Sequence, residues 1–162
     1  MRGEYLIWDP AKDVAPLILP NLVTDTGEEE FLKMIMQNVS AVAGGANFFI
    51  GMLDETPTET LTLSAITTEP TSAGTYSRKS VARNTTGWPT VATINGHKCI
   101  TSAGVTFTAS GANFSRAFSR LFLTDQASGT AGILYSISGP LVSPLLLVSG
   151  QSRVVQYRLY MN

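Results

Sequence analysis

One histidine and one cysteine are the residues of this chain best suited to catalysis or zinc binding. His97 and Cys99 lie two positions apart in an apolar run. Side chains at this spacing on a strand point in parallel from one face, and do not converge on a single substrate atom. A zinc site built here would need carboxylates for its remaining ligands. We therefore expect a solvated strand histidine, no catalytic residue and no zinc site.

The acidic residues offer two further kinds of chemistry. Asp54, Glu55 and Glu59 share one stretch rich in threonine and proline. A glycosidase pair needs one of its acids in an apolar pocket, which this stretch does not supply. Calcium binding by carboxylate and backbone oxygens suits the loop better, although the EF-hand spacing is absent. The run Glu28–Glu30 stands where a helix would begin and favours its dipole. We expect solvated acids, with no metal and no cofactor.

Hydroxyl side chains replace charges in the composition. Charged residues make up 14% of the chain, whereas soluble proteins average about a quarter. Threonine and serine occur nineteen and fifteen times, and apolar residues reach 44%. The apolar share is enough for a core within one domain. A surface rich in hydroxyl groups suits exposed sheet faces and a protein that packs against neighbours.

The two halves of the chain carry opposite charge. Residues 1–70 hold eleven acids and three bases (−8), and residues 71–162 hold one acid and eight bases (+7). These charges either neutralise one another within the fold or join two copies of the chain. Arg78, Lys79 and Arg83 form the densest basic cluster and are candidate partner-binding residues. The other bases are scattered, so we expect no specific nucleic-acid partner.

The number of cysteines and the hydropathy of the chain indicate the cellular compartment in which it is made. A single cysteine permits no intrachain disulfide. The start of the chain does not resemble a signal peptide, and no apolar run approaches the roughly 20 residues of a membrane-spanning helix. We expect synthesis in a reducing cytoplasm and no membrane partner.

Residues 1–24 combine large apolar side chains with prolines that interrupt any periodicity. Proline lacks a backbone donor and holds the preceding residue in extended geometry, whereas a disordered tail would contain fewer apolar groups. The pattern predicts an extended attachment arm, which lies on its own domain or on a neighbouring subunit. Its candidate contact residues are Tyr5, Leu6, Ile7, Trp8, Leu17, Ile18 and Leu19.

Residues 25–162 are expected to form one domain, with a helix over 26–38 followed by about eight strands. Thr26 is the expected helix N-cap, and Asn95-Gly96 is a strong signal for a two-residue hairpin turn. The remaining β-branched and aromatic runs are separated by turn residues at roughly ten-residue spacing. The fold class is therefore all-β, an antiparallel sandwich or jelly roll. Its expected strands cover 47–53, 61–64, 75–81, 91–94, 97–101, 105–109, 120–124, 132–135 and 154–160.

The order of turn and strand phrases resembles small virion proteins of tailed bacteriophages, of the capsid-decoration and tail-accessory type. The resemblance covers residues 26–160. It rests on Phe48–Met52, Gly74–Arg78, Gly87–Pro89, Val105–Gly111, Leu121–Asp125, Ala127–Gly129 and Gly139–Leu141. It implies a β-sandwich within the assembled particle that has neither a cofactor nor enzymatic activity.

The resemblance leads to an expected function as a capsid decoration, or cement, protein in the virion. Its partners would be the major capsid protein and other copies of itself. A tail, collar or fibre-base adaptor that contacts tail or portal-proximal proteins is the alternative. A second alternative is a carbohydrate-binding module that reads a host surface through Trp88, Tyr76 and the loop 54–59. That module would need Trp88 exposed, because glycans stack on exposed aromatic rings.

Overall fold

The chain folds into antiparallel strands with one helix in a computed structural model that describes residues 2–36 and 47–161. All the strand ladders between these residues are antiparallel, which confirms the expected all-β class. The helix is α1 (Asp25–Met36), and two short 3-10 turns are η1 (Leu63–Ala65) and η2 (Ala73–Thr75). The strands are β1 (Arg2–Trp8), β2 (Leu17–Val23), β3 (Asn47–Leu53), β4 (Lys79–Ala82), β5 (Thr90–Ile94), β6 (His97–Thr101), β7 (Val105–Thr108), β8 (Arg120–Thr124), β9 (Leu134–Ser138) and β10 (Ser152–Met161).

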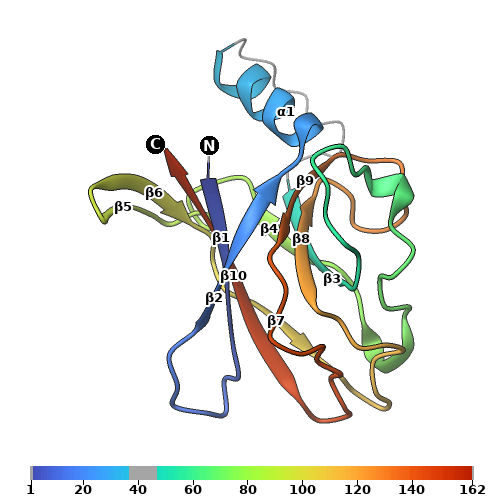
Figure 1. Ribbon diagram of the computed structural model, residues 1–162. Helices are drawn as coiled ribbons and strands as arrows, with labels where there is room; N and C mark the ends of the chain where they lie inside the picture. Colours follow the sequence, from blue (N-terminus) through green and yellow to red (C-terminus); the bar gives the residue numbers. More distant parts are fainter. Residues whose placement is uncertain (1, 37–46, 162) are drawn as a thin grey trace.

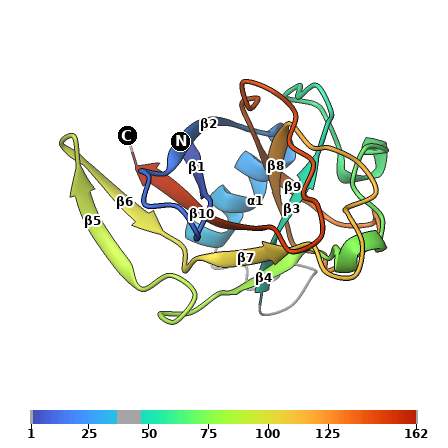
Figure 2. The same cartoon turned by 90° about the horizontal axis from the view of Figure 1, so that it is seen from below.

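The described strands form one continuous sheet that curls into a half-barrel (Figure 1). Their order is β4-β3-β8-β9-β2-β1-β10-β6-β5, and β7 pairs with β10. Viewed from below, the curl brings β4 close to β7, while β5 and β6 extend away from the body (Figure 2). One end of the sheet is therefore drawn in against the body and the other stands open.

Two strands make the curl by changing partners along their length. β2 pairs with β1 through residues 17–20 and with β9 through residues 21–23. Pro20, which has no N–H to donate, stands at this change of partner, a position where a strand tolerates proline. β10 pairs with β1 along one edge, and with β7 and then β6 along the other.

The expected arm over residues 1–24 is corrected by this arrangement. β1 and β2 lie in the middle of the sheet, so the proposed boundary at residue 24 does not separate an arm from a domain. Tyr5 is fully buried, and Leu6, Ile7 and Leu19 are at most 6% exposed. The prolines stand outside or at the ends of the paired runs, because residues 2–8 precede Pro10 and residues 17–19 lie between Pro16 and Pro20. The segment is therefore ordered although it contains three prolines.

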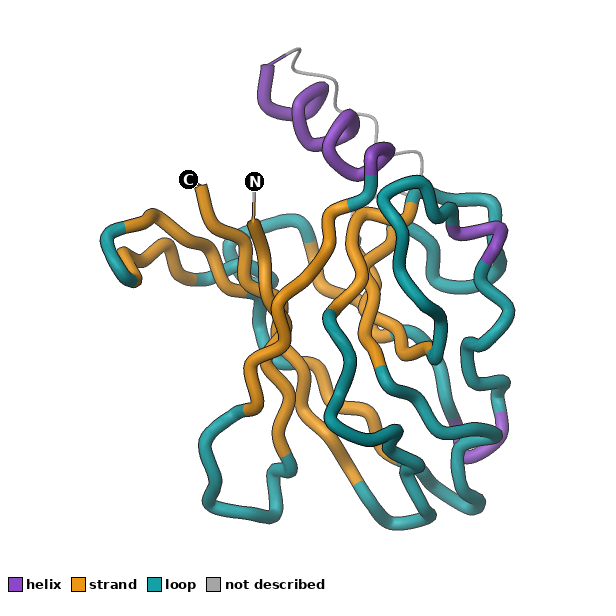
Figure 3. The backbone as a smooth tube through the Cα atoms, in the orientation of Figure 1, coloured by secondary structure: helices purple, strands orange, loops and turns teal. Residues whose placement is uncertain are grey.

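The main core lies inside the curl, and a smaller one lies on the outer face of β3, β8 and β9. Alternation along β8 divides its side chains between them, because Leu121 and Leu123 point inward and Phe122 points outward. Leu63 and Ile66, from the long connection after β3, cover Phe122. Figure 3 shows this connection as a layer of loop outside the strands. β3 and β8 are thus buried on both faces, as expected for 47–53.

The N-cap of α1 is Thr24, not the expected Thr26. The Gly27 amide donates to Thr24 Oγ1 at 3.1 Å, which satisfies one of the unpaired donors of the first turn. A side chain at Gly27 would collide with the carbonyl oxygen of Tyr135, so glycine permits α1 to begin directly against β9. The expected helix end at residues 37–38 lies outside the described residues.

Most of the other predicted strands are present with shifted ends. Asn95 and Gly96 have φ angles of 52° and 81°, the type I′ turn that this dipeptide predicts. The predicted strand at 61–64 is wrong, because a 3-10 turn there directs Leu63 into the outer core. The strand predicted from residue 75 begins only at Lys79, since Gly74 and Thr75 both have positive φ.

Candidate functional site

The two residues best suited to chemistry do not form a site. His97 is exposed at the tip of the β5–β6 hairpin, whereas Cys99 is 2% exposed on the same strand. Solvent reaches the imidazole and does not reach the thiol, so no substrate can contact both. Across residues 2–36 and 47–161, no three histidine, cysteine or acidic side chains are grouped as metal ligands.

The carboxylates after β3 hold the loop in place. Asp54 Oδ1 accepts a hydrogen bond from Ser119 Oγ. Glu55 Oε2 accepts one from Thr68 Oγ1 at 3.2 Å. These bonds tie the start of the loop to the β7–β8 connection and to its own return. Glu59 is exposed.

Arg78 is a buried structural residue, which corrects its assignment to a surface patch. Its side chain is 3% exposed and forms a bidentate ion pair with Glu69, at 2.6 Å from Nη2 and 2.8 Å from Nε. The guanidinium also donates to the carbonyls of Gln126 and Gly129, and lies 5.1 Å from the centre of the Phe122 ring. It therefore joins the β3–β4 connection to the β8–β9 connection over the outer core.

The other two cluster residues contact different parts of the molecule. Lys79 Nζ donates to Ser77 Oγ at 3.1 Å and lies 5.9 Å from the Phe107 ring. The Arg83 guanidinium lies 5.2 Å from the centre of the Phe48 ring, at the rim of a cavity. The three bases do not form one basic surface. Strand alternation and the shortened β4 separate side chains that are neighbours in the sequence.

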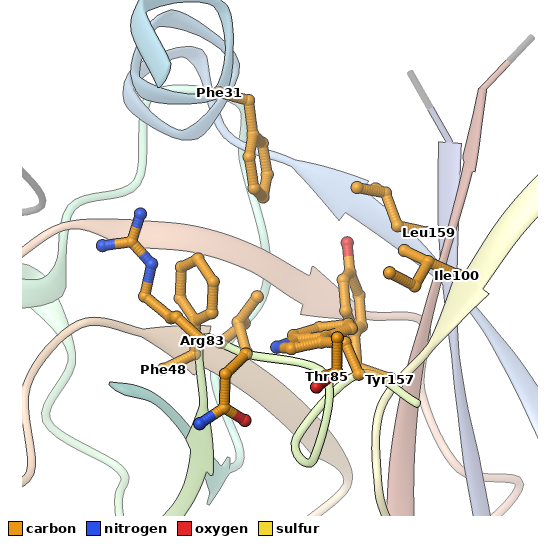
Figure 4. A pocket seen from close by; sticks show the side chains of 10 residues that line it. Phe31, Phe48, Arg83, Thr85, Ile100, Tyr157 and Leu159 are labelled. Carbon is orange, nitrogen blue, oxygen red and sulfur yellow. The ribbon is translucent and has the colours of Figure 1, made fainter. Parts of the chain in front are cut away.

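An apolar cavity of about 470 Å³ opens beneath α1, between the two ends of the curled sheet. Figure 4 shows Phe31 pointing down into it from the helix, Ile100 and Leu159 lining one side, and Arg83 the other. Ten residues line it, and they come from positions between 31 and 159, so local sequence gives no signal of it. The described lining residues are suited to apolar contact, and none of them is a carboxylate.

Aromatic side chains form the floor of this cavity. The Trp88 ring meets Phe48 and Tyr157 edge-on, with ring centres 5.9 Å and 6.3 Å apart. Trp88 Nε1 is buried and has no hydrogen-bond partner among residues 2–36 and 47–161. Tyr157 continues the stack to Tyr5 at 4.8 Å. Burial raises the pKa of Tyr157 to about 12, so its hydroxyl stays protonated and accepts a bond from Asn21.

The residues expected to read a glycan are not brought together. Tyr76 is buried, and its hydroxyl donates to Glu69 and accepts from the Met52 amide. Its ring packs against Phe107 and Phe114, whereas Trp88 belongs to the cavity floor. The aromatic rings and the acidic loop do not share one exposed surface.

Exposed apolar side chains mark the surface instead. In the β1–β2 hairpin, Val14, Leu17 and Ile18 are 58%, 45% and 53% exposed. Leu17 and Ile18 are the two of the seven expected arm contacts that remain available to a partner, and Trp8 is half-buried. Val14 was missed by sequence reasoning, because neither its residue type nor its spacing distinguishes a loop tip from a core position. The other exposed large apolar side chains are Leu32, Val91, Val142, Leu146 and Val148.

The opposite charges of the two halves meet within the described part of the chain, as three ion pairs illustrate. Glu4 binds Arg158 at 2.8 Å, Asp9 binds Arg153 at 3.1 Å, and the third is the Glu69–Arg78 pair. In each pair an acid from the first 70 residues contacts a base from the rest. The fold therefore uses part of the charge asymmetry internally.

The geometry defines an antiparallel β protein with an apolar cavity and an exposed apolar hairpin. No family model, no curated protein and no solved structure matches the chain. Among the described residues, no helix is long and apolar enough to cross a membrane.

Proposed function

We propose that the protein is a structural virion protein without catalytic activity. In this role it decorates and cements a bacteriophage capsid by bridging neighbouring major capsid subunits. The observation that carries the proposal is that the β1–β2 hairpin leaves three large apolar side chains exposed, Val14, Leu17 and Ile18, with Leu17 and Ile18 on opposite faces of β2. A concentration of exposed apolar side chains on one element is typical of a segment that another protein covers.

The surroundings of this hairpin support a docking role. Arg153 binds Asp9 at the base of the hairpin, and residues 9–11 and 150–152 line a shallow hollow beside it. The hairpin is thus tied to the start of β10, which gives its exposed apolar side chains a fixed base. A preorganised contact costs less entropy when a partner binds. We also propose that the curled sheet acts as a sandwich, in which its two halves form the two layers around one core.

A tail, collar or fibre-base adaptor would use the same surface on a different partner. Both roles imply synthesis in the host cytoplasm and assembly onto the particle. Images of virus particles with and without the protein distinguish them, because the missing density lies on the head in one case and on the tail in the other. Density lost from neither place would overturn both roles.

The docking surface is tested with Ile18→Asp, which places a charge on the exposed hairpin. Added to particles that lack the protein, purified wild-type chain should restore the missing density. The variant should need at least tenfold more protein, because a buried unpaired carboxylate opposes binding. Leu32→Asp, at a 57% exposed position on α1, is the matched control and should bind as the wild type does. Equal binding by Ile18→Asp would contradict a role for the hairpin.

A further inference from the structure

The open end of the sheet is strand β5. In the order of the described strands β5 comes last, and its one ladder is with β6 (Figure 1). The hairpin of β5 and β6 stands out from the body, with β5 on the outside (Figure 2). A row of backbone donors and acceptors on the outer edge of β5 thus faces away from the rest of the fold.

This edge lacks the features that usually prevent strand pairing. Natural edge strands carry charges, an internal proline or a bulge, or are covered by other segments. β5 reads Thr90-Val91-Ala92-Thr93-Ile94, which contains none of the charged residues and no proline. Four of its five residues are β-branched, and Val91 is 68% exposed. At the opposite end of the sheet, β4 contains Lys79 and approaches β7.

The hairpin turn determines which backbone groups face outward. Because Asn95 and Gly96 form a two-residue turn, Ile94 and His97 are its hydrogen-bonded pair. Hydrogen-bonded pairs alternate along an antiparallel ladder, so Ala92 directs its backbone groups inward to Cys99. Val91 and Thr93 therefore direct their N–H and C=O groups toward the open edge.

We propose that β5 pairs with β5 of a second copy of this chain across a two-fold axis at Ala92. In this register Val91 of each copy faces Thr93 of the other, and the two pairs exchange four backbone hydrogen bonds. The edge is self-complementary, which is the requirement for a symmetric dimer. Each exposed Val91 also gains cross-strand contact with the Thr93 side chain.

The charges near the edge permit this pairing. Lys98 is the nearest charged residue in the β5–β6 ladder, and its Nζ donates to Thr93 Oγ1 at 2.9 Å. The two copies of Thr93 lie diagonally across the axis, about 8 Å apart, so the two lysine ammonium groups bound to them come within about one Debye length of each other. Salt screens the repulsion between them, so the dimer should be stronger at high ionic strength than at low. The residues of the edge itself are uncharged, so an uncharged edge meets an identical uncharged edge.

Self-association of the purified chain tests the proposal independently of any role in a capsid. A short edge buries little area, so we expect a weak dimer that forms with rising concentration in sedimentation velocity, between about 5 and 500 µM. Val91→Lys should weaken the dimer at least tenfold, since lysine protects natural edges. Val142→Lys, at a fully exposed loop position, is the matched control and should not change it. A chain that stays monomeric, or a dimer that Val91→Lys leaves unchanged, would overturn the proposal.

Cysteine cross-linking tests the register and the identity of the partner strand. A mixture of Val91→Cys and Thr93→Cys chains should form disulfide-linked dimers under mild oxidation, because these positions face each other across the axis. Val91→Cys alone should cross-link poorly, since its two copies lie diagonally, about 8 Å apart, which is too far for a disulfide. The wild-type chain controls for Cys99, which is buried. Equal cross-linking by Val91→Cys alone, or none in the mixture, would contradict this register.

Discussion

Strands β3 and β8 lie at one end of the curled sheet and the β5–β6 hairpin lies at the other, and their surroundings are opposite. β3 and β8 are covered on one face by the main core and on the other by the loop after β3. β5 exposes Val91 on the same face of the sheet as Ile100 and Leu159, which line the cavity and are incompletely packed. The covered end supplies stability, and the open end leaves surface for partners.

The difference in packing between the two ends of the sheet arises from polar side chains as well as from apolar ones. Arg78 and Glu69 fasten the loop over the covered end by four side-chain hydrogen bonds from one guanidinium. At the open end the side-chain bond within the β5–β6 hairpin joins the exposed residues Lys98 and Thr93. A buried, satisfied guanidinium fixes one arrangement of the loops, because any other arrangement leaves a charge without partners.

The largest expected change in stability follows from removing the Arg78 guanidinium. Arg78→Met leaves Glu69 without its ion-pair partner, although the Tyr76 hydroxyl still donates to it, and leaves two carbonyls without their donor; it should lower the free energy of unfolding by about 3 to 5 kcal/mol. Urea denaturation measures the change. The control is Arg116→Met, because Arg116 is exposed and donates to one carbonyl; its effect should stay within about 0.5 kcal/mol. Equal stabilities for the two variants would show that the covered end does not depend on Arg78.

The next largest effect is a loss of stability at alkaline pH, which arises from the buried tyrosines between the two halves of the sheet. Burial raises the pKa of Tyr157 to about 12, compared with the model-peptide value of 10.0. The unfolded chain therefore loses this proton first, and stability is unaffected below pH 10. Between pH 10 and about 12 the free energy of unfolding should fall by about 1.4 kcal/mol per pH unit for this residue.

Urea denaturation at several alkaline pH values measures that slope. Tyr157→Phe removes the ionisable group and should make the slope shallower, although it also loses the bond from Asn21. Tyr5 adds to the slope in both proteins, since burial raises its pKa as well. An unchanged slope in Tyr157→Phe would mean that Tyr157 ionises equally in the folded and unfolded chains.

The smallest expected difference in stability comes from making the same Leu→Phe substitution at each end of the sheet, which compares how tightly the two ends are packed. Leu121→Phe adds volume at a fully buried position on β8 and should cost about 1 to 3 kcal/mol. Leu159→Phe adds the same volume beside the cavity and should cost less than about 0.5 kcal/mol, because space for the ring exists. Thermal unfolding of both variants makes the comparison. Equal destabilisation would contradict the difference in packing between the two ends.

Local sequence predicted the elements whose pattern is complete within a few residues. The Asn95-Gly96 turn is an example, because two residues determine the backbone geometry there. The all-β class was also predicted correctly, because each strand shows its own local pattern. The curl of the sheet could not be predicted from local pattern. β1 and β2 were not predicted, since their prolines suggested an arm, and only the pairing with β9 and β10 explains why the segment folds.

The functional surface was less predictable than the fold. Arg78 and Lys79 are adjacent in sequence, but the burial of Arg78 depends on Glu69 and on two carbonyls about 50 positions further on. The cavity combines residues from α1 to β10. Contacts of this kind depend on how the sheet curls, and the curl cannot be predicted from residue type and spacing.

The pairing of β1 with β10 also determines when the chain can fold during its synthesis. Glu4 and Arg158 form an ion pair although they are 154 positions apart. At about 5 to 20 residues per second, β1 leaves the ribosome roughly 7 to 30 s before its partner strand. During that interval the side chains of Tyr5 and Ile7 lack their cover from β10, and contacts between distant positions form slowly. A nascent chain that has not reached Ser152 is therefore the species that most needs a chaperone.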